Sequence, residues 1–137
     1  MRIMCDTNVV IDVLLDREPF VTDAYRVLHL CEEHKIDGFV SASAVTDIYY
    51  LVRKYTHSTE QAYRAVGKVL DIVKVCSVTN HDVLNAFQKR AKDFEDCLVA
   101  TCAQAIRCDA IVTRNKKDFE GLGVPVLSPT ELLSQMT

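Results

Sequence analysis

Four acidic positions have the type and spacing expected of ligands for a divalent cation. Asp6 directly follows a short apolar run, Asp47 lies about one turn into a helical segment, and Asp93 and Asp96 open another helical segment. Hard cations such as Mg²⁺ take oxygen ligands, commonly one or two carboxylates together with water and phosphate. These acids therefore predict a metal site, provided that the fold brings them together.

Each of these acids also has an ordinary structural explanation. Asp6 or Asp93 could cap the helix that follows it, and Asp96 at the third helical position would favour the positive end of the helix dipole. Asp47 could lie on a solvated helix face, and Asp118 could be a simple loop residue. Asp96 is the hardest to explain in this way. The segment after it is apolar on nearly every face, and an acid entering a buried helix needs a partner.

The elements that must position these acids alternate between strands and helices. We expect strands over residues 3–5, 38–42, 75–78, 110–113 and 124–127. Such alternation gives a doubly wound α/β fold, with a parallel sheet covered by helices on both faces. The first strand is apolar throughout and is therefore placed centrally, and right-handed crossovers then give the order 3-2-1-4-5. Ligands bind where such a sheet reverses its winding, beyond the carboxyl ends of the strands.

Helical spacing and small polar residues define the helices between these strands. We expect helices over residues 9–15, 20–34, 43–55, 59–73, 80–87, 93–106 and 129–133. The expected first residues or caps are Ser43, Ser58 or Thr59, Asn80, Asp93 and Pro129. The side chains expected to face the core are Val66, Val69, Leu70 and Val73 in one helix, and Val83, Leu84 and Phe87 in the next.

Length and composition predict one globular domain over residues 1–137. The chain is 49% hydrophobic and 26% charged, and no apolar run is long enough for a membrane span. The first residues lack a signal-peptide layout, so we expect a cytoplasmic location. None of the six cysteines forms a C-x-x-C pair, which favours buried free thiols, with Cys108 the most exposed. The net charge of −3 argues against coating nucleic acid through bulk charge alone.

Four segments, in the same order, resemble those of the PIN-domain nucleases. They are residues 4–12 (MCDTNVVID), 43–50 (SAVTDIYY), 93–100 (DFEDCLVA) and 111–119 (IVTRNKKDF). Within that family the chain resembles the VapC-type toxins of prokaryotic toxin–antitoxin pairs. The resemblance implies an endoribonuclease dependent on Mg²⁺ or Mn²⁺, which leaves 5′-phosphate and 3′-hydroxyl ends. It also implies a cognate antitoxin protein and a homodimer.

The resemblance assigns roles to individual residues. Asp6 and Asp96 would be the principal metal ligands, while Asp47 would bind metal or orient the attacking water. Asn115 would complete the catalytic set from the end of the fourth strand. Supporting residues would be Thr7, Asn8, Thr113 and Asp118. Residues that could contact the RNA backbone, or could simply be solubilising charges, are Arg53, Lys54, Arg114, Lys116 and Lys117.

The sequence departs from the family pattern at two positions. The second acid is more often Glu in the family but is the shorter Asp47 here, and the fourth position is often Asp but is Asn115 here. Asp93 or Asp118 would then supply the missing charge, or the site would hold one metal rather than two. A catalytically weak scaffold that only binds RNA or a protein is the non-enzymatic alternative.

Two other classes also place an aspartate after the first strand. Phosphatases of the haloacid-dehalogenase type use a D-x-D pair, where this chain has Asp6, Thr7 and Asn8, and they are usually longer. Receiver domains need paired acids after strand one and a lysine after the last strand, where Ser128 and Pro129 stand here. Both alternatives are therefore less consistent with the residues.

Overall fold

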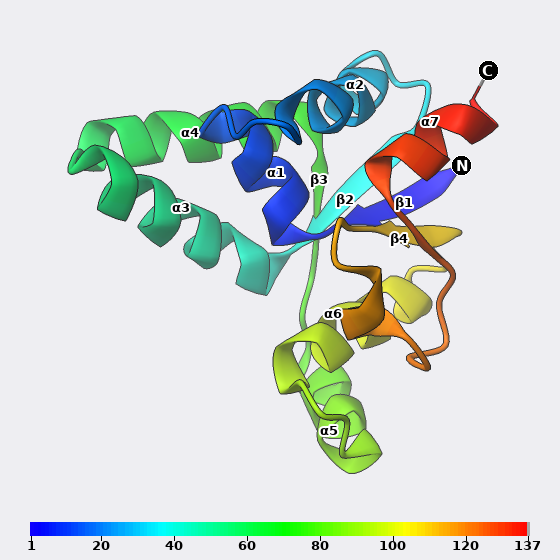
Figure 1. Cartoon of the computed structure of the whole chain (residues 1–137). Coiled ribbons are helices and arrows are strands. Elements are labelled where there is room, and N and C mark those ends of the chain that lie inside the picture. Colours follow the sequence, from blue (N-terminus) through cyan, green and yellow to red (C-terminus); the bar gives the residue numbers. More distant parts are fainter. Residues whose placement is uncertain (137) are drawn as a thin grey trace.

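Within residues 1–136, which the computed structural model describes, five parallel strands form one sheet in the order β3-β2-β1-β4-β5 (Figure 1). This confirms the predicted fold class and strand order. Thr137, the last residue of the expected domain, lies outside the described residues. The strands are β1 (Arg2–Cys5), β2 (Asp37–Ser41), β3 (Lys74–Cys76), β4 (Ala110–Val112) and β5 (Val126–Leu127).

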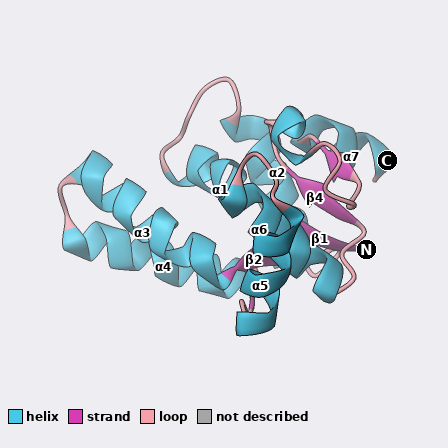
Figure 2. Ribbon diagram, turned by 90° about the horizontal axis from the view of Figure 1, so that it is seen from below, coloured by secondary structure: helices cyan, strands magenta, loops and turns pink. Residues whose placement is uncertain are grey.

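Helices cover both faces of the sheet. They are α1 (Thr7–Leu14), α2 (Val21–Glu32), α3 (Ala42–Thr56), α4 (Thr59–Ile72), α5 (Asn80–Lys89), α6 (Phe94–Ala105), α7 (Pro129–Gln135) and a 3-10 helix η1 (Lys116–Phe119). Figure 1 shows α5 and α6 on one side of the sheet and α1, α2 and α7 on the other. The α3–α4 pair extends beyond the sheet as an arm (Figure 2). The described residues include no helix that is long and apolar enough to cross a membrane.

The two faces of β1 belong to two different cores. Ile3 and Cys5 pack into the core formed with α1 to α4, whereas Met4 packs into the core formed with α5 and α6. This division follows from the alternation of side chains along a strand. Ile3 and Met4 are both 0% exposed, which is worth about 1.5–3 kcal/mol for each side chain. The predicted central position of the first strand is therefore confirmed.

Helix beginnings differ from two of the expected caps. Ser41 caps α3, accepting a hydrogen bond from the Ala44 backbone N–H at 3.3 Å, so the expected cap Ser43 already lies inside the first turn. Thr79 rather than Asn80 caps α5, and Asp82 completes a capping box with it. In both cases the chain enters the helix earlier than expected, because the preceding strand ends sooner than its apolar run suggests. Ser58, Asp93 and Pro129 begin their helices as expected.

The faces that α4 and α5 bury also differ from the expected ones. Leu70 is 52% exposed and Phe87 53% exposed, while alanines on the same helices are buried. Short alanine side chains let these helices pack closely against their neighbours, and the larger residues turn outward. The expected core residues that the structure places on the surface are Leu70, Val83, Leu84 and Phe87.

The cysteines are free thiols, as expected. Cys108 is half-buried, and the other five are buried. Burial raises the pKa of Cys102 to about 12 and that of Cys108 to about 11, which keeps both thiols protonated at neutral pH.

Candidate functional site

Asp6 stands at the junction of β1 and α1, where it caps the helix. As the N-cap of α1, its Oδ1 accepts a hydrogen bond from the Thr7 backbone N–H at 2.8 Å. Its other oxygen, Oδ2, accepts a hydrogen bond from Thr113 Oγ1 at 2.8 Å. The carboxylate is therefore fixed from two directions at the carboxyl end of the central strand.

Thr113 follows β4 and links three segments through one hydroxyl group. Its Oγ1 donates to Asp6 and accepts hydrogen bonds from Asn8 Nδ2 at 3.2 Å and from the Asn115 backbone N–H at 3.0 Å. One donated and two accepted bonds use the full capacity of a hydroxyl. Among the described residues, Asn8 Oδ1 is the buried side-chain oxygen that has no hydrogen-bond partner. A free acceptor thus lies beside the fixed carboxylate of Asp6.

Asp93 and Asp96 approach the same edge from the start of α6. Asp93 is the exposed N-cap of that helix and accepts a hydrogen bond from the Asp96 backbone N–H at 3.0 Å, so the capping explanation holds for Asp93. Asp96 is half-buried and its side chain faces a hollow of about 350 Å³, which we call the acidic hollow. The polar residues that line the acidic hollow are Asp6, Thr7, Asn8, Arg17, Asp93, Glu95, Asp96, Asn115 and Asp118.

Crowding of carboxylates shows in the acidity of the acidic hollow. Burial, together with the nearby negative charges of Asp93 and Asp6, raises the pKa of Asp96 to about 7. Burial also raises the pKa of Asp6, although the hydrogen bonds from Thr113 and Thr7 oppose this rise. Both carboxyls are therefore costly to ionise without a counter-charge, and a cation between them would relieve that cost.

Asp47 lies next to Glu95, which lines the acidic hollow. Among the described residues it does not line the acidic hollow; it lies half-buried on α3, beside Glu95. Burial raises the pKa of Glu95, and the charge of Asp47 and its contact with Glu95 raise that pKa further. Sequence reasoning did not select Glu95, although three acids within residues 93–96 were a visible signal.

The donor set fits a hard cation that keeps part of its water shell. The described residues contain no group of three or more His, Cys, Asp or Glu side chains close enough to hold an ion alone. Asp6 and Asp96 nevertheless offer two carboxylates, and Asn8 offers an unpaired amide oxygen. Mg²⁺ is commonly bound by one or two carboxylates plus water and phosphate.

Two of the expected RNA contacts are engaged inside the protein instead. Arg114 Nε donates to Asp12 Oδ2 at 2.7 Å, and its guanidinium lies over the Phe20 ring at 4.3 Å from the centroid. Lys116 Nζ pairs with Glu131 Oε1 at 2.8 Å. Both side chains are also partly exposed, 27% for Arg114 and 44% for Lys116, and both stay candidates for ligand binding.

The remaining expected RNA contacts lie on the surface. Arg53 and Lys54 are exposed on α3 and line a shallow pocket with Tyr50 and His57. Lys117 is exposed at the start of η1, on the same side of the molecule as Asp118. These three basic residues stay candidates for ligand binding.

The parallel 3-2-1-4-5 sheet, with acids at its switch point, defines a PIN-like α/β protein. A family model described as PIN domain matches residues 2–117, and the chain therefore belongs to the PIN domain family. A search of curated proteins finds no match to this sequence.

Solved structures with the same fold cover almost the whole chain. The VapBC2 complex from Rickettsia felis, bound to a promoter DNA fragment, matches with a TM-score of 0.72 at 18% identity over 93% of this chain and 98% of that one. DNA-bound VapBC from Salmonella typhimurium matches with a TM-score of 0.72 at 17% identity, covering 94% and 98%. VapC20 of Mycobacterium tuberculosis, described as a toxin that cleaves the sarcin–ricin loop, matches with a TM-score of 0.64 at 14% identity, covering 80% and 86%.

Proposed function

We propose that this PIN-domain protein is an endoribonuclease that depends on Mg²⁺ or Mn²⁺ and acts as the toxin of a toxin–antitoxin pair. One observation carries the nuclease proposal. Asp6 and Asp96, both with raised pKa, line one hollow at the switch point of the sheet, where Thr113 fixes Asp6. The family match removes support from the phosphatase and receiver-domain alternatives.

Each residue of the acidic hollow has a task in this proposal. Asp6 and Asp96 hold the cation, and the free oxygen of Asn8 supplies or orients a further ligand. A divalent cation bound there lowers the pKa of a water molecule and offsets negative charge on the phosphodiester under attack. Thr113 keeps Asp6 in one orientation, so that little reorganisation is needed when the ion and substrate bind.

Asp47 acts at one remove in this arrangement. Its contact with Glu95 orients that carboxyl at the rim of the acidic hollow, where Glu95 can accept a hydrogen bond from a water molecule. Attack of water on the phosphorus, with the P–O3′ bond broken and the leaving 3′-oxygen protonated, would give the 5′-phosphate and 3′-hydroxyl ends that the PIN-nuclease resemblance implies.

The toxin role draws on the structural relatives. The Rickettsia felis and Salmonella typhimurium structures are VapBC complexes, and the Mycobacterium tuberculosis relative is described as cutting an RNA loop. We propose, by analogy, a separate antitoxin chain that binds this protein, a homodimeric enzyme, and a cytoplasmic site of action where its RNA lies.

An RNA cleavage assay tests the nuclease proposal. Wild-type protein with Mg²⁺ or Mn²⁺ should cut structured ribosomal RNA, and EDTA should abolish cleavage. Asp96→Asn should lose activity, while Asp71→Asn, which removes an exposed acid of α4, should keep it. Cleavage that resists EDTA, or equal activity of Asp96→Asn and wild type, would overturn the proposal.

A catalytically weak RNA-binding scaffold is the second candidate. It is favoured by the amide of Asn115 at a position where the family often has a carboxylate, and by the place of Asp47 outside the acidic hollow. RNA binding without cleavage in the same assay would favour this candidate.

A further inference from the structure

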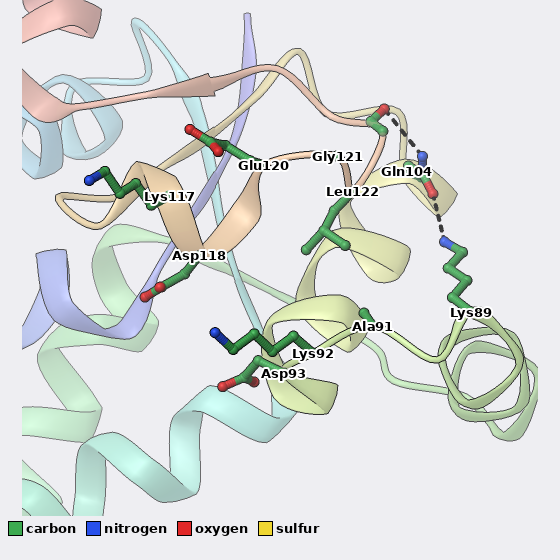
Figure 3. A pocket seen from close by; sticks show the side chains of 11 residues that line it. Lys89, Ala91, Lys92, Asp93, Gln104, Lys117, Asp118, Glu120, Gly121 and Leu122 are labelled. Atoms are coloured by element: carbon green, nitrogen blue, oxygen red, sulfur yellow. Dashed lines mark hydrogen bonds between the residues drawn. The ribbon is translucent and has the colours of Figure 1, made fainter.

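A second, larger hollow shares part of its lining with the acidic hollow. It encloses about 990 Å³ between the α5–α6 connection and residues 117–123, and we call it the lysine groove (Figure 3). Asp93 and Asp118 line both the lysine groove and the acidic hollow. A polymer bound in the acidic hollow can therefore extend past Asp93 and Asp118 into the lysine groove.

Three lysines give the groove its chemistry. Lys89, Lys92 and Lys117 line it, and none of them takes part in an ion pair in the part of the chain that the structure describes. In Figure 3, Lys89 and Lys117 lie at opposite ends, and the amino group of Lys92 lies on the side towards Asp118. Unpaired ammonium groups spaced along a channel suit a backbone that carries regularly spaced negative charges.

Lys89 is held in place by a short hydrogen-bond chain. Its Nζ donates to Thr101 Oγ1 at 3.2 Å and to Gln104 Oε1 at 3.3 Å, while Gln104 Nε2 donates to the Gly123 carbonyl at 3.2 Å. Because these partners are uncharged, they fix the side chain without neutralising it. The positive charge is therefore preorganised at the far end of the groove.

The opposite wall of the groove is backbone and one apolar side chain. Gly121 and Gly123 have φ of +76° and +84°, a conformation that favours glycine, and a side chain built at Gly121 would meet nothing within 4 Å. Leu122 projects between them into the groove (Figure 3). This wall offers open space and an apolar surface that a sugar or base can cover.

We propose that the lysine groove binds the single-stranded RNA flank that continues from the phosphodiester in the acidic hollow, and this inference rests on the proposed function. The strand must continue beyond the cleaved bond, and the lysine groove shares Asp93 and Asp118 with the acidic hollow. The lysines contact its phosphates, and Leu122 contacts a base or ribose. Three acids also line the groove, but Asp93 and Asp118 lie at the end shared with the acidic hollow, away from Lys89 (Figure 3).

Binding of a fluorescently labelled single-stranded RNA oligonucleotide tests this site apart from cleavage. Anisotropy titrations over a range of salt concentrations would use an Asp96→Asn background in EDTA, so that no turnover occurs. Adding Lys92→Gln and Lys117→Gln together should weaken binding several-fold and flatten the log–log salt dependence by about 1.4, or about 0.7 for each lost phosphate contact. Adding Lys35→Gln and Lys68→Gln, two exposed lysines elsewhere, should change neither quantity.

Cleavage kinetics in the wild-type background give a second, separable readout. The Lys92→Gln/Lys117→Gln protein should show a raised KM with kcat nearly unchanged, because contacts along the flank serve substrate and transition state alike. If the Lys92→Gln/Lys117→Gln variant matches the Lys35→Gln/Lys68→Gln control in affinity, salt slope and KM, the proposed RNA binding in the lysine groove is wrong. The nuclease proposal is unaffected by that result. If the Lys92→Gln/Lys117→Gln variant loses affinity but the wild-type protein cuts no RNA, the result would support RNA binding in the lysine groove and overturn the nuclease proposal.

Discussion

At the scale of single residues, the site depends on a threonine that carries no charge. Thr113 is 0% exposed, and its hydroxyl bonds Asp6, Asn8 and the Asn115 backbone at once. The carboxylate of Asp6 is therefore held in one direction by a buried neutral group. The sequence points to the acids as the functional residues, but the orientation of Asp6 is set by the neutral Thr113.

Removing only that hydroxyl should therefore damage both stability and function. We expect Thr113→Val, which keeps the side-chain shape, to lower the free energy of unfolding by about 1–3 kcal/mol because three polar groups lose their partner. Cleavage should fall as well, since Asp6 is no longer held. Thr113→Ser, which keeps the hydroxyl, serves as the control. Urea denaturation measures the effect, and a Val variant as stable as the Ser variant would contradict the role given to this bond.

The raised pKa of Asp96 predicts a pH dependence of stability without metal. Its pKa of about 7 in the folded state lies above the ordinary value of 3.8 for an aspartate, so the folded state binds this proton more tightly than the unfolded chain does. This contribution to stability is full below about pH 4 and is lost as pH rises towards 7. Melting curves in EDTA between pH 5 and 8 should show wild type losing stability with rising pH more steeply than Asp96→Asn. Parallel pH profiles would argue against a crowded carboxylate.

At the scale of elements, a clamp made by Asp12, Arg114 and Phe20 ties α1 to the loop after β4. Asp12 is 1% exposed, and Arg114 bonds both its oxygens, at 2.7 and 3.2 Å. Arg114 is the residue between Thr113 and Asn115, so the clamp fixes the segment that supports Asp6. Arg114, which was expected to contact RNA, thus helps to fix the segment that holds Asp6.

Breaking the clamp should cost stability and slow the reaction more than it weakens substrate binding. We expect Asp12→Asn to lower the free energy of unfolding by about 1.5–3 kcal/mol, the usual worth of hydrogen bonds to charged groups. In cleavage kinetics, kcat should fall more than KM rises, because Thr113 and Asn115 lose their fixed position. The double variant Asp12→Leu/Arg114→Met, which removes both charges, should recover part of the stability. If Arg114 only bound RNA, Asp12→Asn would instead raise KM and leave kcat unchanged.

Sequence patterns predicted the elements well because strand runs and helix caps are local signals. The five strands and the caps Ser58, Asp93 and Pro129 follow from neighbouring residues, and the strand order follows from a central first strand and right-handed crossovers. Helix phase was harder. Val83, Leu84 and Phe87 have helical spacing, yet α5 buries Ala86 and Asp82 instead, since only tertiary packing decides which face turns inward.

The candidate site shows the same limit. Asp6 and Asp96 were identifiable from their positions after a strand and inside a buried helix. The pairing of Glu95 with Asp47 and of Asp12 with Arg114 joins residues far apart in the chain, which no local pattern reveals. A usable hint existed for Asp12, because an acid within the apolar run 9–15 requires a buried partner.

At the scale of the whole molecule, metal binding should appear as added stability. An ion that binds only the folded state raises stability by RT ln(1 + [L]/Kd), about 2.7 kcal/mol at a hundredfold excess over Kd. We therefore expect Mg²⁺ and Mn²⁺ to raise the melting temperature of wild type and to have little effect on Asp96→Asn. If neither Mg²⁺ nor Mn²⁺ changes the melting temperature of the wild-type protein, the proposed metal site is wrong.

Self-association is the second prediction at this scale. The α3–α4 arm projects from the body of the molecule (Figure 2) and exposes Tyr50, Tyr55 and Tyr63, each by more than 60%. Exposed aromatic surface of this kind is typical of an interface. Light scattering at micromolar concentration should give twice the 15.4 kDa mass of one chain. A monomer under these conditions would contradict the dimer.

The central position of β1 has a consequence for how the protein is made. Residues 2–5 are synthesised well before β4, yet one edge of β1 pairs with β4, and Asp6 accepts a hydrogen bond from a hydroxyl 107 positions later in the chain. During synthesis Asp6 therefore has no support from Thr113 until the segment around β4 has emerged. If translation ends before residue 110, the chain lacks β4 and also lacks Thr113 and Asn115. Translation products that end before β4 are thus unable to assemble the site, so the site forms only in chains that include the fourth strand.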